Sequence, residues 1–230
     1  MKTIYTLVLL FVTIFPFAQN VPIDFELGGN GLNWTWTTFE NDTNPALETV
    51  ANPDPSGINT SATVAKFTAL QTGQPWAGCE SMHGSDIGSF AFNNNNCTVS
   101  IMVWKSVISD VGIKFVDATS AAQPEIKIAN TLINQWEKIT FDFSSRIGVF
   151  PITKDQIVIF PDFDLGGRSQ DNIIYFDNVY GASSNTGFGN DNRSELIVSP
   201  NPAKDLLNIS ITNFNGNITT EIFDLTGVLV

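Results

Sequence analysis

The feature that most constrains this chain is a series of short runs rich in β-branched and aromatic residues, each ended by a turn-forming cluster. No stretch holds an apolar period of 3.6 residues for three turns, as an amphipathic helix would. Such strands at near-regular spacing predict an all-β protein, an antiparallel β-sandwich of the jelly-roll type with about ten strands. The runs lie at residues 34–37, 62–67, 100–105, 111–116, 125–128, 136–143, 156–160 and 173–176, and the turn clusters at 28–31, 52–57, 93–96 and 165–168.

A different pattern precedes the strands. Met1 and Lys2 form a short cationic start, residues 4–17 are almost entirely apolar, and Ala18 is a small residue before a polar pair. This order is typical of a secretory signal peptide, here residues 1–18. The apolar run is shorter than the ~20 residues that a membrane-spanning helix needs, and no later run approaches that length. We therefore expect a protein without a membrane span that is exported through the periplasm and secreted or held at the cell surface.

The charge and the shortage of histidine and cysteine exclude several kinds of partner. The net charge is −12, from 11 basic and 23 acidic residues, which repels phosphate backbones and excludes nucleic acid as a partner. One histidine and two cysteines cannot build a His-rich or Cys-cluster metal site. Cys79 and Cys97 would be free to form a disulfide in an oxidising compartment, but geometry decides this and the sequence does not show it.

The composition changes after the last strand of the sandwich. We place the sandwich domain at residues 21–181, a linker rich in Gly, Ser, Asn and Thr at 182–194, and a second, small β unit at 195–230. Two segments of that unit resemble the C-terminal sorting domain of the type IX secretion system of Bacteroidetes. They are Val-Ser-Pro-Asn-Pro-Ala-Lys-Asp at residues 198–205 and Ile-Phe-Asp-Leu-Thr-Gly at residues 222–227. The resemblance implies the type IX secretion machinery as a partner. Since the pattern stops before the later strands of such domains, we expect a partial sorting domain in a fragment of a longer protein.

The sandwich domain has a resemblance of its own. Three segments are similar, in their order and spacing, to jelly-roll carbohydrate-binding modules of secreted polysaccharide-degrading enzymes of marine Bacteroidetes. They are Ile-Asp-Phe-Glu at residues 23–26, Trp-Glu-Lys-Ile-Thr-Phe-Asp-Phe-Ser at 136–144 and Tyr-Phe-Asp-Asn-Val at 175–179. The resemblance implies a polysaccharide ligand and a structural calcium ion held by Glu26 and Asp177. From the residues alone, these two carboxylates are interpreted equally well as acids that cap turns.

A glycan site needs exposed aromatic rings, on which sugar C–H groups stack, beside polar groups that bond to sugar hydroxyls. Trp76 meets this description, because it lies in a turn-rich segment with Glu80 and the only histidine, His83. Trp34 and Trp36 are two residues apart, so in a strand both would point to one face, either the core or a binding surface.

The remaining candidates are more ambiguous. Trp104 shares a strand face with Met102 and would line a ligand groove or pack with that methionine. Asp164 and Arg168 flank a Gly-Gly turn and would either form a surface ion pair or hydrogen-bond a sugar. Trp136 alternates with apolar residues, which predicts a place in the core.

Catalytic patterns are weak in this sequence. No strand carries the paired acids of a glycosidase, and His83 has no nucleophile elbow near it. We therefore expect no catalytic residues and non-catalytic binding of a polysaccharide. The acidic surface favours a neutral glycan such as a β-glucan over sulfated or uronic chains. Two alternatives stay open: a small jelly-roll polysaccharide lyase or glycoside hydrolase, and a structural adhesin module in which every tryptophan is buried.

Overall fold

The computed structural model describes residues 22–180, 196–199 and 208–211, and the chain divides into two compact units, Met1–Thr186 and Gly187–Val230. The predicted signal peptide and linker lie outside the described residues. No helix among the described residues is long and apolar enough to cross a membrane.

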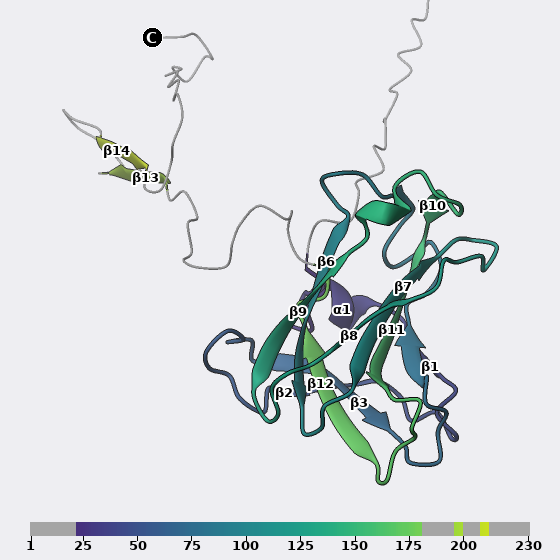
Figure 1. Cartoon of the computed structure of the whole chain (residues 1–230). Helices are drawn as coiled ribbons and strands as arrows, with labels where there is room; N and C mark the ends of the chain where they lie inside the picture. Colours follow the sequence, from purple (N-terminus) through teal and green to yellow (C-terminus); the bar gives the residue numbers. More distant parts are fainter. Residues whose placement is uncertain (1–21, 181–195, 200–207, 212–230) are drawn as a thin grey trace, which may run out of the picture. The chain divides into compact units, whose positions relative to one another are not determined.

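The first unit is an antiparallel β-sandwich of two five-stranded sheets with a small two-stranded sheet, which confirms the predicted fold class (Figure 1). One sheet, here the β11 sheet, has the order β1 (Thr37–Phe39), β4 (Gly78–Glu80), β11 (Gln156–Phe163), β7 (Asp110–Val116), β8 (Ile126–Ala129). The other, the β12 sheet, has the order β2 (Glu48–Ala51), β3 (Thr63–Ala69), β12 (Asn172–Asp177), β6 (Thr98–Lys105), β9 (Trp136–Asp142). The remaining elements are β5 (Phe90–Ala91) paired with β10 (Thr153–Lys154), the one-turn helix α1 (Asn30–Asn33) and the 3-10 helix η1 (Ser144–Arg146).

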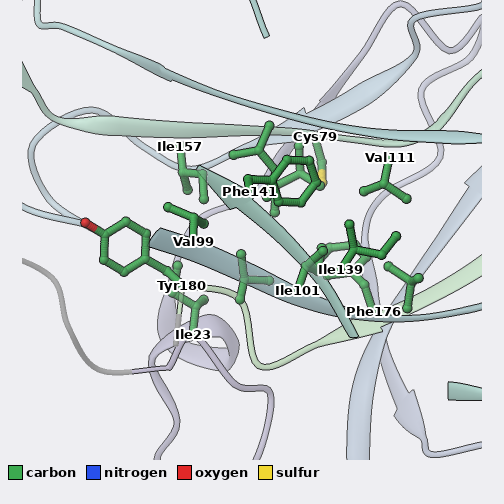
Figure 2. Close-up of a cluster of buried hydrophobic side chains, with 14 of the residues drawn as sticks. Ile23, Cys79, Val99, Ile101, Val111, Ile139, Phe141, Ile157, Phe176 and Tyr180 are labelled. Carbon is green, nitrogen blue, oxygen red and sulfur yellow. The ribbon is translucent and has the colours of Figure 1, made fainter. Parts of the chain in front are cut away.

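The core lies between the two sheets, because alternate side chains of each strand point inward. On β7, Ile113 and Phe115 are buried whereas Lys114 between them is partly exposed. Figure 2 shows isoleucine, valine and phenylalanine side chains from both sheets meeting in one cluster. Cys79 and Cys97 are both buried in this cluster as free thiols, and burial raises the pKa of the Cys79 thiol.

The beginning and the end of the sandwich are joined directly. Ile23 N–H donates to the Val179 carbonyl at 2.7 Å, and Val179 N–H donates back to Ile23 at 3.1 Å. Ile23 and Tyr180 consequently pack in the same core cluster (Figure 2). This pairing brings the segment that holds Glu26 beside the strand that holds Asp177.

The predicted strand at residues 34–37 is wrong at its start. The chain instead forms α1, passes through an irregular segment and enters β1 only at Thr37. The indole N–H of Trp36 donates to the Gly31 carbonyl at 2.8 Å, which ties this segment to the helix rather than to a sheet.

The second unit contains a two-stranded antiparallel sheet of β13 (Leu196–Ser199) and β14 (Asn208–Ile211). Strands were expected within residues 195–230. Most of the sorting-domain motif, residues 200–205 and 222–227, lies outside the described residues.

Candidate functional site

The outer face of the β11 sheet carries an aromatic and charged surface, which we call the Phe160 face. One row of residues crosses the whole sheet, since Phe39 of β1 lies opposite Gly78, and Gly112 lies opposite both Phe160 and Lys127. The Phe160 face consists of Phe39, Glu80, Lys114, Lys127, Phe160 and Phe163.

Two glycines make room for the rings of this face. A Cβ atom at Gly112 would lie 3.1 Å from Cδ2 of Phe160, and one at Gly78 would lie 2.7 Å from Cζ of Phe39. The two rings meet edge to face, with centroids 5.7 Å apart. Glycine at both neighbouring positions therefore lets the phenylalanine rings lie close to the backbone of the sheet.

Lysine side chains cover these rings. Nζ of Lys127 lies 3.9 Å from the ring centroid of Phe163, and Nζ of Lys114 lies 5.5 Å from that of Phe160. Phe160 is consequently only 4% exposed. Lysine stems are flexible and can move aside from the surface they cover. Burial raises the pKa of Glu80, an effect that the charges of His83 and Lys114 partly offset.

Three sequence-predicted residues follow one another along β4 and its ends. Trp76 is 41% exposed and lies in the turn just before the strand, which is closed by a 2.9 Å bond from Ala77 N–H to the Gln74 carbonyl. Glu80 ends the strand and His83 follows it, with Nδ1 2.7 Å from Oδ1 of Asp155. The structure thus places Trp76 just before β4 and His83 just after it, while Glu80 at the end of β4 belongs to the Phe160 face.

Asp164 and Arg168 do not pair with each other, in contrast to the predicted surface ion pair. Asp164 is exposed, and its N–H donates to the Pro75 carbonyl at 3.1 Å, so its loop lies beside the turn that holds Trp76. Arg168 is buried, with Nε 2.8 Å from Oδ2 of Asp162. Its guanidinium also donates to the Gln74 carbonyl at 2.9 Å. Arg168 therefore supports the Trp76 turn from inside rather than facing a ligand.

The other tryptophans pack against protein. The rings of Trp34 and Trp36 lie 5.9 Å apart, and both half-buried side chains pack against the core cluster. Trp104 lies in the β12 sheet, outside the Phe160 face, and its ring meets that of Tyr175 edge to face at 5.5 Å. Trp136 is buried, as predicted, and its indole N–H donates to Oδ1 of Asn52 at 3.0 Å.

Glu26 and Asp177 come to one corner of the sandwich. Oε1 of Glu26 accepts the Thr63 N–H at 2.9 Å, and the Thr63 hydroxyl donates to the Phe25 carbonyl at 2.7 Å. Asp177 is fully buried, and its Oδ1 has no hydrogen-bond partner among the described residues. Within that part of the chain, no group of three or more His, Cys, Asp or Glu side chains is arranged to hold a metal ion, so further ligands would be other oxygens, such as backbone or asparagine carbonyls or water.

Comparisons with known proteins give distant structural likeness only. No family model and no curated protein matches the chain. Among solved structures, the CBM22-1 xylan-binding domain from Paenibacillus barcinonensis Xyn10C is 13% identical with a TM-score of 0.44, over 74% of this chain and 100% of that one. A family 61 module in complex with β-1,4-galactotriose is 10% identical with a TM-score of 0.40, over 69% and 92%.

A third solved structure, a mutant of the family 29 carbohydrate-binding module CBM29-2, is 10% identical with a TM-score of 0.42, over 69% of this chain and 88% of that one. The assignment of the fold therefore depends on the strand pairing of this chain itself.

Proposed function

We propose that this protein binds a polysaccharide without cleaving it, through the Phe160 face and the neighbouring Trp76. The observation that carries the proposal is an aromatic row on the outer face of the β11 sheet, covered only by lysine side chains, with a 41% exposed tryptophan two residues before Gly78 of that row. Stacking surfaces for sugar C–H groups and partners for sugar hydroxyls thus occur together.

The chemistry of the chain favours a neutral polysaccharide, such as a β-glucan. A net charge of −12 repels sulfated and uronic chains at long range. On the Phe160 face itself, Lys114 and Lys127 lie with Glu80, so donors and acceptors of both signs are present. We further propose that the protein is secreted or held at the surface of a Bacteroidetes cell through type IX secretion, on the motif at residues 198–205 and 222–227.

Titration calorimetry and affinity electrophoresis against laminarin, xylan, mannan and galactan test the binding. Trp76→Ala and Phe39→Ala should each weaken the interaction about tenfold, the loss of an aromatic anchor. Leu27→Ala is the control, because Leu27 is 96% exposed and lies outside the face. Absence of binding to every polysaccharide would overturn the function, whereas binding that neither variant weakens would overturn the site.

One observation supports a second candidate, a polysaccharide lyase or hydrolase. His83 is held by Asp155 at 2.7 Å and its ring is partly exposed, as a general base requires. This candidate predicts new reducing ends, or unsaturated products that absorb ultraviolet light, and their loss in His83→Ala. A purified protein that releases neither product from the same panel contradicts it.

We also propose a structural calcium ion at the Asp177 corner. A buried carboxylate oxygen without a partner among the described residues suits a hard cation that prefers oxygen ligands. Asp177 and Glu26, with nearby backbone carbonyls, would hold the ion and fasten the first segment of the sandwich to its last strand.

A further inference from the structure

A hollow of about 330 Å³ lies where three connecting segments meet the small β5–β10 sheet. It shares no residue with the Phe160 face. Its walls are formed by Ser89, the turn at residues 117–119 and the segment at residues 150–155. The volume falls at the lower end of the ~300–1,000 Å³ typical of small-molecule sites, so the hollow is too small for a long stretch of polysaccharide.

The apolar wall is an exposed loop that is held firmly from behind. Phe150 is 68% exposed and Ile152 is 56% exposed. The buried ammonium of Lys154 donates to the carbonyls of Pro151 and Ile152, the latter at 3.1 Å, and the Gln123 amide donates to the carbonyl of Phe150. The loop therefore presents large apolar side chains in a fixed arrangement, which is typical of a recognition surface.

The opposite wall supplies hydrogen-bond acceptors. Oδ1 of Asp117 accepts from the Thr119 N–H and hydroxyl, both at 2.8 Å, and these bonds hold the pKa of Asp117 below its usual value. Oδ1 of Asp155 is bonded to His83 at 2.7 Å. The second oxygen of each carboxylate has no hydrogen-bond partner among the described residues.

The charged side chains that line the hollow favour a neutral sugar over an anionic one. Asp117 and Asp155 both line it, while the ammonium of Lys154 is already bonded to two carbonyls and lies 5.0 Å from the Phe92 ring centroid. An anionic sugar would meet two carboxylates, and the one lysine in the lining is already engaged. A neutral sugar would donate its hydroxyls to those carboxylates and place its C–H face on an aromatic ring.

We propose that this hollow is a second binding site, which takes a terminal sugar unit of a neutral glycan. The sugar stacks on Phe150 and donates hydroxyl hydrogen bonds to Asp117 and Asp155. The choice of a glycan as ligand follows from the proposed function, but the site is separate from the Phe160 face. The two sites together would hold one chain along its length and at its end.

Nuclear magnetic resonance titration of the whole protein with glucose, xylose, mannose, galactose and their β-linked disaccharides tests this site. At least one sugar should shift the amide signals of Thr119 and Ile152. Phe150→Ala and Asp155→Asn should each weaken that binding about tenfold, whereas Leu27→Ala and Trp76→Ala should leave it unchanged. Because the Phe150 side chain is largely exposed, its removal should leave the melting temperature unchanged, and Phe150→Leu provides a milder second variant.

The outcomes separate the two proposals. Absence of shifts with every sugar, or shifts that both Phe150 variants leave unweakened, overturns the second site, and binding of laminarin by the Phe160 face can still stand. Sugar binding at the hollow without any polysaccharide binding at Trp76 overturns the proposed function of the Phe160 face and leaves the second site in place.

Discussion

Asp177 is an acidic group in a place that disfavours charge. Its side chain is fully buried, and Oδ2 accepts hydrogen bonds from the amides of Asn59 and Asn178, both at 3.2 Å. Burial raises the pKa of Asp177, and the nearby charge of Asp24 adds to the rise. The folded protein therefore binds this proton more tightly than the unfolded chain does. The contribution of Asp177 to the free energy of unfolding falls as pH rises from the unfolded pKa through the raised folded value.

Asp177→Asn should remove this pH dependence and the response to calcium together. Without divalent cations, the variant should be at least as stable as the wild type at pH 7. Calcium at a hundred times its dissociation constant should add about 2.7 kcal/mol to the wild type and nothing to the variant. Thermal melts from pH 4 to 8, in EDTA and in calcium, measure both effects. Asp142→Asn, at an exposed acid, is the control, and an equal calcium response of all three proteins would contradict the site.

At the scale of elements, a buried ionic network joins the two sheets. Asp162 of β11 lies 3.5 Å from Nζ of Lys105 of β6 and 2.8 Å from Nε of Arg168, and Asn172 of β12 donates to it at 2.9 Å. Burial lowers the pKa of Lys105 to about 8, against the opposing effect of Asp162. The network thus connects β6, β11 and β12 around a single carboxylate.

Removing the charge of Asp162, at the centre of this network, should lower the free energy of unfolding far more than removing one of the cations around it. Asp162→Asn leaves Lys105 and Arg168 as uncompensated buried charges, which typically costs about 3–5 kcal/mol. Lys105→Met keeps Asp162 paired with Arg168 and should be neutral or stabilising. Denaturant unfolding measures both variants. In the wild type, the free energy of unfolding should rise as pH increases from about 8 toward the unfolded lysine value of about 10.4, a rise absent in Lys105→Met.

The glycines of the Phe160 face give a second prediction at this scale. Alanine at Gly112 must push the Phe160 ring aside, which should cost about 1–3 kcal/mol and weaken polysaccharide binding. Alanine at Gly78 should cost more, because its Cβ meets the Ile159 backbone carbonyl at 2.5 Å and backbone yields less than a ring. Gly166→Ala is the control, since its closest contact, 3.1 Å, is the exposed carboxylate of Asp164. Equal effects of all three substitutions in unfolding and calorimetry would contradict this order.

The strands could be predicted from the sequence, but the pairing that builds the Phe160 face could not. Periodicity located β6, β7, β9, β11 and β12, because each is a short apolar or alternating run. All eight residues of β11 are buried, so its sequence does not show that Phe160 faces outward. Lys114 and Lys127 became candidates only when β7 and β8 were paired, and Arg168 turned inward because Asp162 is buried below it.

At the scale of the whole molecule, the surface keeps the acidic balance of the composition, a net charge of −12. Burial withdraws equal numbers of basic and acidic side chains from the surface, since the buried ones are Lys105, Lys154 and Arg168 and also Asp155, Asp162 and Asp177. Acidic side chains therefore dominate the field that an approaching polymer meets. The Debye length is about 8 Å at physiological ionic strength, so this field acts over short range and weakens as salt is added.

Salt should therefore separate the classes of polysaccharide. Binding of a neutral β-glucan should change less than about twofold between about 20 mM and 500 mM sodium chloride, because stacking and hydrogen bonds to uncharged hydroxyls are little screened. An anionic chain such as polygalacturonate should bind weakly at low salt. Its affinity should not fall at high salt, because salt screens the repulsion between the acidic protein and the anionic chain. Calorimetry at both ionic strengths measures this. A different result would contradict this expectation: binding of the anionic chain that falls steeply as salt is added, and a salt dependence that disappears in the double variant Lys114→Gln, Lys127→Gln. That result would mean that these two lysines bind an anionic glycan despite the net negative charge of the protein.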